Sequence, residues 1–180
     1  MKALILVDIQ KDFCPGGTLA VTEGDQVVKP ANRLMEDFEK NGLPVFLTRD
    51  WHPANHSSFK ENGGFWPSHC IADTDGAAFH NGLKISKHAV IISKATDIDS
   101  DAYSGFQGTD LKERLRSLKI TELIILGLAT DYCVKNTVMD ALSNGFSVSV
   151  VNEGIRAVDV KIGDGDRAIE EMKAAGAFFL

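Results

Sequence analysis

The chain has 180 residues, of which 44% are hydrophobic and 24% charged, and its formal net charge is −6 at pH 7. This length suits a single domain, residues 1–180, with a full hydrophobic core, and the acidic balance without a basic block argues against nucleic acid as a partner. No apolar run approaches the length of a membrane span, and the N-terminus predicts a strand rather than a signal peptide. The three cysteines lie far apart in the sequence and cannot all pair, which favours a reduced, cytoplasmic protein.

The first fifty residues predict two strands separated by a helix. The uninterrupted apolar run Ala3–Val7 is typical of a central strand in a parallel sheet, and Asp8 falls at its carboxyl end. Apolar residues then recur at helical spacing from about Asp25 to Asn41. Pro30 is tolerated only near the first turn of a helix, which leaves the start of this helix open. Pro44–Thr48 is the second predicted strand.

A long loop, residues 53–83, follows the second strand. It shows no sustained periodicity, and a loop of this length inside a compact domain is usually functional. Beyond it, strands and helices are predicted in alternation at residues 89–93, 109–118, 122–126, 134–142, 147–151, 166–175 and 177–180. This alternation predicts a three-layer α/β/α domain with a mostly parallel, doubly wound six-stranded sheet.

Cys133 stands in the stretch LIILGLATDYCVKNTV, residues 123–138, which reads as a strand, a tight turn and a helix. The N-terminus of a helix offers unpaired N–H groups and a positive dipole end, and both favour a thiolate over a thiol. Cys133 is therefore a candidate nucleophile. A buried structural cysteine is the ordinary alternative for a cysteine considered alone.

Three polar residues are predicted at the carboxyl ends of separate strands, namely Asp8, Lys94 and Cys133. Open α/β sheets keep their ligand sites at this edge. A carboxylate can take the proton of a thiol and return it to a leaving group, while a nearby cation keeps both negative charges tolerable. Each residue alone could be a loop cap, a solvated lysine or a core cysteine, but their joint placement favours one site.

A second polar group follows the second strand. Asp50 and His52 are two residues apart, and His69 comes seventeen residues after His52. A carboxylate with two imidazoles is a common ligand set for zinc or iron, although a turn carboxylate with surface histidines fits the spacing equally well. His56 is left open as a fourth ligand, and Cys70 is assigned to the core.

Aromatic residues lie in the same loops as these polar groups. Phe13, Trp51, Trp66 and Tyr103 have core or loop packing as their default role. If a site exists there, they could form the walls of an apolar slot that holds a flat ring.

Six segments, in order, resemble the nicotinamidases, also called pyrazinamidases, of the isochorismatase-like cysteine hydrolase family. The resemblance covers essentially the whole chain. The segments are LILVDIQKDFCPGG at 4–17, TRDWHPANHSSF at 48–59, WPSHC at 66–70, SKATD at 93–97, YSGF at 103–106 and GLATDYCVKNT at 127–137. Isochorismatases proper lack the nucleophilic cysteine and the metal ligands, so the residues present here favour the amidase branch.

The resemblance implies the isochorismatase-like hydrolase fold and a catalytic triad of Asp8, Lys94 and Cys133. It also implies a cis peptide between Leu128 and Ala129, which would direct the N–H of Ala129, together with that of Cys133, at an oxyanion. The implied reaction converts nicotinamide and water to nicotinate and ammonia through a thioester, in pyridine-nucleotide salvage.

The resemblance further implies one divalent metal ion held by Asp50, His52 and His69. Zinc is the expected ion, with iron or manganese as alternatives, and it would bind the ring nitrogen of the substrate. The residues expected around the substrate are Phe13, Trp66, Tyr103 and Leu128. Nicotinamide is the expected partner, with no nucleic acid and no membrane, and association into a homo-oligomer is left open.

Two other functions remain open on the sequence. A related cysteine amidohydrolase could act on an N-carbamoyl or ureido compound, although such substrates offer no ring nitrogen to a metal. A non-catalytic α/β domain that binds a metal or a small molecule is the alternative from a different class.

Overall fold

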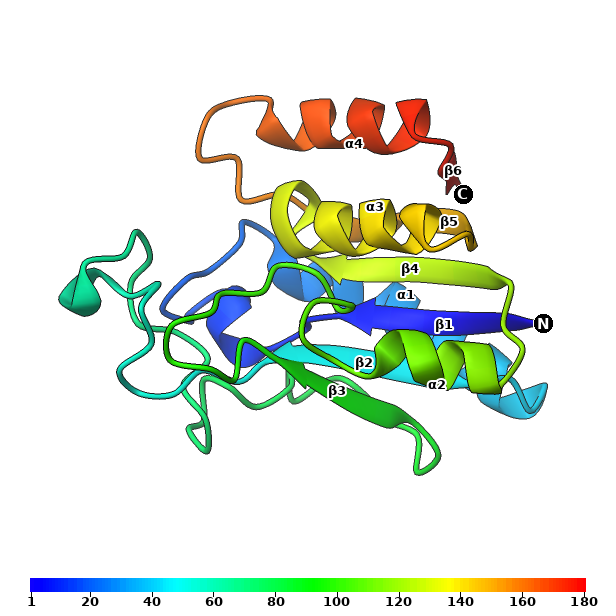
Figure 1. The fold of residues 1–180 in the computed structure, drawn as a ribbon, viewed down its shortest axis with the longest axis horizontal. Helices are drawn as coiled ribbons and strands as arrows, with labels where there is room; N and C mark the ends of the chain where they lie inside the picture. Colours follow the sequence, from blue (N-terminus) through cyan, green and yellow to red (C-terminus); the bar gives the residue numbers. More distant parts are fainter.

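The computed structural model describes residues 1–180 as one six-stranded sheet with helices on both faces (Figure 1). The strands lie in the order β3-β2-β1-β4-β5-β6, and every neighbouring pair is parallel. Their bounds are β1 Lys2–Val7, β2 Val45–Asp50, β3 Val90–Lys94, β4 Glu122–Leu128, β5 Ser147–Arg156 and β6 Phe178–Phe179. The predicted α/β class is confirmed, and the sheet is wholly rather than mostly parallel.

Four α-helices form the two outer layers. They are α1 Val28–Lys40, α2 Leu111–Ser117, α3 Lys135–Ser143 and α4 Asp164–Ala174. In Figure 1, α2 and α3 lie in front of the sheet and α1 lies behind it, while α4 runs beside α3. None of these helices combines the length and the apolar composition that crossing a membrane would require.

The sheet separates two hydrophobic clusters. Successive residues of β1 point to opposite faces, so that Leu4 and Leu6 join the cluster beneath α1 while Ile5 and Val7 join the cluster beneath α2 and α3. All four side chains are at most 1% exposed. A strand that is covered on both faces gains from apolar residues at every position, which explains the continuous apolar run in the sequence.

The helix predicted near residue 25 begins later than its pattern suggests. Residues Gly24–Val27 form a 3₁₀ turn, and α1 begins at Val28. Pro30 then lies in the first turn of α1, where its missing N–H removes no intrahelical hydrogen bond.

Two further predictions of local structure differ from the structure. β5 continues to Arg156, beyond the predicted end at residue 151, after an irregularity in its pairing with β4. Asn152 and Glu153 are exposed in this extension, so the apolar pattern stops before the strand does. The apolar spacing that predicts a helix at residues 134–142 includes Met139, but this side chain is 36% exposed, because α3 turns Val138 and Ala141 towards the sheet instead.

The strand order determines where along the carboxyl ends of the strands a site can form. The chain moves outward from β1 through β2 to β3, returns to β4 on the other side of β1, and continues to β5 and β6. Such a reversal leaves a crevice at the carboxyl ends of the two strands that flank it, here β1 and β4. The loops that follow β1, β2 and β3 gather at this end of the sheet (Figure 1).

Candidate active site

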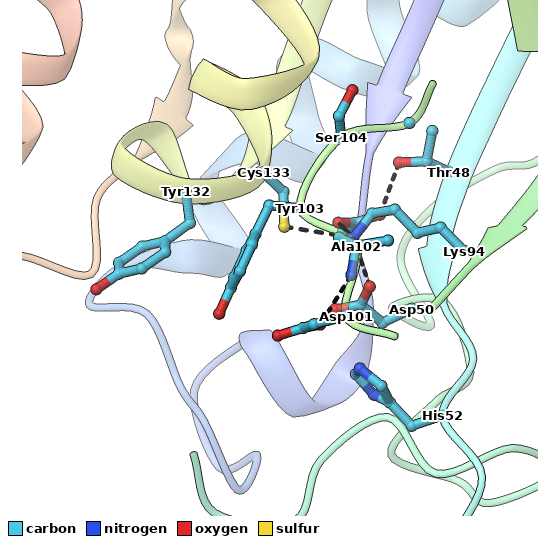
Figure 2. Close-up of polar contacts among 12 residues, drawn as sticks. Thr48, Asp50, His52, Lys94, Asp101, Ala102, Tyr103, Ser104, Tyr132 and Cys133 are labelled. Carbon is cyan, nitrogen blue, oxygen red and sulfur yellow. Dashed lines mark hydrogen bonds and ion pairs between the residues drawn. The ribbon is translucent and has the colours of Figure 1, made fainter. Parts of the chain in front are cut away.

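Asp8, Lys94 and Cys133 meet at the carboxyl edge of the sheet. Asp8 follows β1, Lys94 is the last residue of β3, and Cys133 lies in a π-helical turn, Thr130–Val134, between β4 and α3. The Nζ atom of Lys94 is 3.0 Å from Oδ2 of Asp8 and 3.4 Å from Sγ of Cys133 (Figure 2). The sequence grouped these three residues, and the structure brings them together.

Lys94 is a buried ammonium group with several partners. Its side chain has no exposed surface, and Nζ also forms an ion pair with Asp50 and donates a hydrogen bond to the carbonyl of Ala102 at 2.9 Å. Burial opposes the positive charge, but Asp50 and Asp8 outweigh it and raise the pKa of Lys94 well above its ordinary value. Lys94 therefore remains charged between two carboxylates.

Asp8 is fully buried and has one oxygen available for proton transfer. Its Oδ1 accepts a hydrogen bond from Oγ1 of Thr48 at 2.6 Å. Its Oδ2 lies at ion-pair distance from Lys94 but receives no hydrogen bond of normal geometry, so it keeps a lone pair free. Burial raises the pKa of Asp8, while the charge of Lys94 acts in the opposite direction.

Cys133 rests as a neutral thiol. Burial raises the pKa of Cys133 well above its ordinary value, Lys94 lowers it, and Asp8 and Asp50 raise it further. The sequence led us to expect that a helix N-terminus would favour the thiolate, but α3 begins only at Lys135. Desolvation outweighs the dipole here, so the thiol needs a base, and Asp8 is the group in position.

Ala129 presents a free amide beside Cys133. The Leu128–Ala129 peptide is cis, as the resemblance implied. The carbonyl of Ala129 accepts the N–H groups of Tyr132 and Val134 at 3.1 and 3.0 Å, whereas its own N–H donates to no acceptor within the chain. Both Ala129 and Cys133 line the cavity described below.

Asp50, His52 and His69 bring their donor atoms together. One ligand atom from each residue lies within 4.8 Å of the others. Nδ1 of His52 is 3.1 Å from the carbonyl of His69, and Nδ1 of His69 is 2.7 Å from the carbonyl of Pro67. A carbonyl can only accept, so each Nδ1 carries the proton and each Nε2 keeps its lone pair.

This donor set fits a divalent metal ion. Burial is the largest influence on His52 and lowers its pKa to about 3, with His69 and His56 acting in the same direction, so the imidazole is neutral. Metal ligation requires this neutral form. One carboxylate and two imidazole nitrogens are a set that zinc and other first-row divalent ions accept, with positions left for water or substrate.

His56, which the sequence left open as a fourth ligand, has partners within the protein for both ring nitrogens. Its Nδ1 accepts the N–H of Ser58 at 3.2 Å, and its Nε2 lies 3.3 Å from the carbonyl of Ser100. The proton is therefore on Nε2. His56 connects the loop after β2 to the loop after β3, and its ring lies 4.5 Å from that of His52.

An aromatic cavity opens over the thiol and over Asp50, His52 and His69. Phe13, Trp66 and Tyr103 line it, as expected, and Tyr132 completes the wall. The Nε1–H of Trp66 donates to the hydroxyl of Tyr103 at 2.8 Å, and the ring of Tyr132 packs edge-on against Trp66 at 5.1 Å. These contacts hold the rings as the sides of a slot for a flat molecule (Figure 2 shows Tyr103 and Tyr132).

Two residues expected near this cavity do not line it. The side chain of Leu128 is fully buried in the cluster beneath α1, because the alternation along β4 turns it away from the site. Trp51 packs against the same cluster, with the guanidinium of Arg49 3.5 Å above its ring. The Leu128 side chain, expected around the substrate, therefore does not reach the cavity.

Several residues of the site were not found from the sequence. Tyr132 and Asp101 line the cavity, Thr48 holds Asp8, and the carbonyl of Ala102 holds Lys94. Tyr132 could have been found from its place beside Cys133 in the last of the six segments. The carbonyl of Ala102 has no sequence signal, since every residue carries one.

The chain is similar to known proteins over almost its whole length. The Isochorismatase domain model matches residues 2–180. A nicotinamidase of Escherichia coli is 44% identical over an alignment of 197 positions, gaps included, which covers 98% of this chain and 92% of the relative.

Two solved structures have the same fold over nearly the whole chain. The crystal structure of a pyrazinamidase of Pyrococcus horikoshii in complex with zinc is 46% identical with a TM-score of 0.95, and the match covers 99% of this chain and 98% of the other. PnC1 from L. infantum, solved in complex with nicotinate, is 34% identical with a TM-score of 0.92 and coverages of 100% and 92%.

Proposed function

Because the chain belongs to the isochorismatase-domain family, we propose that its site hydrolyses the carboxamide of nicotinamide, giving nicotinate and ammonia. One observation carries the proposal: the thiol of Cys133 and the three metal-binding residues line the same aromatic cavity. A flat heteroaromatic ring with one carboxamide matches these features. Pyrazinamide, which also has a ring nitrogen in the matching position, is proposed as a second substrate.

Asp8 carries the proton through the reaction. It takes the proton of Cys133, and the resulting thiolate attacks the carboxamide carbon to form a tetrahedral intermediate. The N–H groups of Ala129 and Cys133 stabilise the oxyanion. Asp8 then gives its proton to the amide nitrogen, the C–N bond breaks, and ammonia leaves a thioester on Cys133.

The thioester is then hydrolysed by water. Asp8, ionised again, takes a proton from the water as its oxygen attacks the thioester carbonyl, and the proton returns to the sulfur as the C–S bond breaks. Nicotinic acid and the neutral thiol are the products, and the acid then gives its proton to ammonia or water to become nicotinate. Lys94 contacts both Asp8 and Cys133. Its ammonium keeps Asp8 in place and stabilises the negative charge of the Asp8 carboxylate in each step.

Asp50, His52 and His69 are the proposed ligands of one divalent ion, and we assign zinc. When bound, the ion supplies a Lewis acid that holds the ring nitrogen of the substrate and so fixes the carboxamide over the thiol. Phe13, Trp66 and Tyr103 exclude water from the ring and restrict it to one plane. The cytoplasm is the proposed location, in keeping with three unpaired cysteines.

Ammonia release by the purified protein tests the proposal. Nicotinamide, pyrazinamide and an N-carbamoyl compound are offered in parallel at equal concentration, with the Cys133→Ala variant as the control. Release from the two ring amides by the native protein alone supports the proposal. Release from the N-carbamoyl compound only would replace it with the ureido alternative, and no release from any substrate would favour a binding domain.

A further inference from the structure

Gln10 and Asp12 are two buried polar residues that take no part in the chemistry described above. Gln10 directly precedes the 3₁₀ turn Lys11–Phe13, and Asp12 lies within this turn, which comes shortly after β1 and Asp8. Their side chains form hydrogen bonds only with backbone groups. Those groups belong in part to the segments that carry the three metal-binding residues.

Gln10 holds the backbone of Asp50. Its Nε2 donates to the carbonyl of Asp50 at 2.8 Å, and its Oε1 accepts the N–H of Asp50 at 2.8 Å. The second Nε2 hydrogen goes to the carbonyl of Ala77 at 2.9 Å. The backbone of β1 turns away from β2 at Asp8, where φ is +47°, so the amide of Gln10 replaces the strand pairing that has ended. These hydrogen bonds fix the backbone from which the carboxylate of Asp50 extends.

Asp12 holds the peptide that follows His69. Its Oδ2 accepts the N–H of Cys70 at 2.7 Å, and its Oδ1 accepts the N–H of Thr18 at 3.3 Å. Cys70 has a φ of +46°, a conformation that residues other than glycine adopt uncommonly, and a hydrogen bond to a carboxylate is strong enough to favour it.

The turn at Cys70 passes this constraint to both histidines. The carbonyl of Cys70 accepts the backbone N–H of His52 at 3.0 Å, and the carbonyl of His69 faces Nδ1 of His52 at 3.1 Å. The Asp12 carboxylate cannot easily move away, because Gly76 packs so closely that an added Cβ would overlap it. Asp12 is also only 8% exposed.

We propose that Gln10 and Asp12 are positioning residues that set the affinity of the site for its divalent metal. The inference rests on the ligand assignment made under the proposed function. Gln10 orders the Asp50 ligand, and Asp12 orders the His52 and His69 ligands through Cys70. Groups that orient metal ligands in this way typically alter affinity by 10- to 100-fold when they are replaced.

The test is the zinc affinity of the metal-free protein, measured by competition with a chromophoric chelator and without substrate. Gln10→Glu keeps the shape but cannot donate to the carbonyls of Asp50 and Ala77, while Asp12→Asn keeps the size but loses the charge and one acceptor. Each variant should bind zinc at least about tenfold more weakly than the native protein. Gln10→Met removes these two hydrogen bonds and also the one accepted from the N–H of Asp50, without adding a charge, and should show at least the same loss.

Two matched controls lose comparable hydrogen bonds elsewhere. Asp131 is also 8% exposed and accepts the N–H groups of Val158 and Asp159, both at 2.9 Å, so Asp131→Asn matches Asp12→Asn. Asn32 donates to Gly82 and accepts from Lys84, both at 2.8 Å, so Asn32→Asp matches Gln10→Glu. Both controls should retain native zinc affinity.

His69→Ala separates the inference from the assignment on which it rests. Circular dichroism of each metal-free variant establishes that it is folded before zinc is added. Native zinc affinity in folded Gln10→Met and Asp12→Asn, with binding lost in His69→Ala, overturns the inference and leaves the ligands assigned. Native affinity in His69→Ala overturns the ligand assignment itself. Weakened binding confined to the Gln10 and Asp12 variants and His69→Ala supports both.

Discussion

At the scale of single residues, the site depends on a thiol that burial keeps neutral. Cys133 is 6% exposed, and its raised pKa means that the reactive thiolate forms only when a base takes its proton. Asp8 is that base in our proposal, and it is also the acid that releases ammonia. One carboxylate therefore serves two steps, and its loss cannot be compensated by a neighbour.

Cys133→Ala should abolish turnover while folding and zinc binding stay near native, because Cys133 is not among the proposed ligands. Asp8→Asn should lower kcat by at least about a hundredfold, in the range typical of general acid–base groups. Ammonia release, circular dichroism and zinc content measure the three properties. Appreciable hydrolysis by Cys133→Ala would rule out a covalent mechanism.

Lys94→Met should move the acidic limb of the pH profile to higher pH. The reaction needs Asp8 ionised, and this form predominates above its pKa. Lys94 lowers the pKa of Asp8, so its removal raises that pKa and activity is lost at a higher pH as the solution is acidified.

At pH values below the pKa of Asp8 in both proteins, the rate of Lys94→Met should be about tenfold lower for each unit by which that pKa rises, because the ionised fraction falls in that proportion. The measurement is kcat/KM against pH at saturating zinc. Thermal unfolding of the same variant is the control for lost stability, since a buried ion pair is broken. An unchanged pH profile at the native rate would show that Lys94 takes no part in the reaction.

At the scale of elements, the sequence predicted most of the regular structure but not the turn that carries the nucleophile. The run Ala3–Val7 could be assigned because burial on both faces leaves an unmistakable apolar pattern. The turn Thr130–Val134 is π-helical, and five residues are too few to show a distinct periodicity. The end of β5 was missed because Asn152 and Glu153 are exposed within the strand.

The same turn is tied to the loop that precedes α4. Asp131 accepts hydrogen bonds from Val158 and Asp159, and Val158 lines the cavity. Asp131→Ala should therefore raise KM for nicotinamide and lower the free energy of unfolding by about 1–3 kcal/mol, the net contribution of two hydrogen bonds. Steady-state kinetics and urea unfolding measure the two effects.

Asp110→Ala is the control for the Asp131 substitution, since Asp110 is exposed and pairs with Arg114 at the surface. It should change neither quantity measurably. A native KM in Asp131→Ala would mean that the loop before α4 does not shape the cavity.

At the scale of the whole molecule, the site exists because the strand order brings distant segments to one edge. The alternation of strands and helices was enough to predict that Asp8, Lys94 and Cys133 share this edge, since parallel strands all end on the same side. It could not predict the contact between Asp50 and Lys94, because the alternation of strands and helices does not determine the order of the strands in the sheet. Nor could it predict which loops close over the edge.

Because Cys133 and the proposed metal ligands line one cavity, we expect a strong preference for nicotinamide over benzamide. Benzamide has the same carboxamide on a ring of the same shape but offers no ring nitrogen. The native protein loaded with zinc should reject it by at least about a hundredfold in kcat/KM, because a site built to bind a polar atom rejects the analogue that lacks it.

His69→Ala should lose this preference together with most of its zinc, while Cys133 remains open to a small thiol reagent. The comparison needs both amides, both proteins and a metal analysis of each. Comparable turnover of the two amides by the native protein would exclude a templating role for the metal. Full selectivity in metal-free protein would exclude the ligand assignment.

The ammonium of Lys94 contacts both Asp8 and Asp50, so the effects of substituting these two carboxylates on stability should depend on each other. Two carboxylates share one cation, so either can be neutralised while the other still balances the charge. Asp8→Asn and Asp50→Asn should each lower the free energy of unfolding only slightly, since each also relieves repulsion between the two carboxylates. The double variant leaves a buried cation with no counter-ion, and its destabilisation should exceed the sum of the single effects by about 0.5–3 kcal/mol. Urea unfolding of the four proteins measures this excess, and simple additivity would show that the proposed base Asp8 and the proposed metal ligand Asp50 are energetically separate.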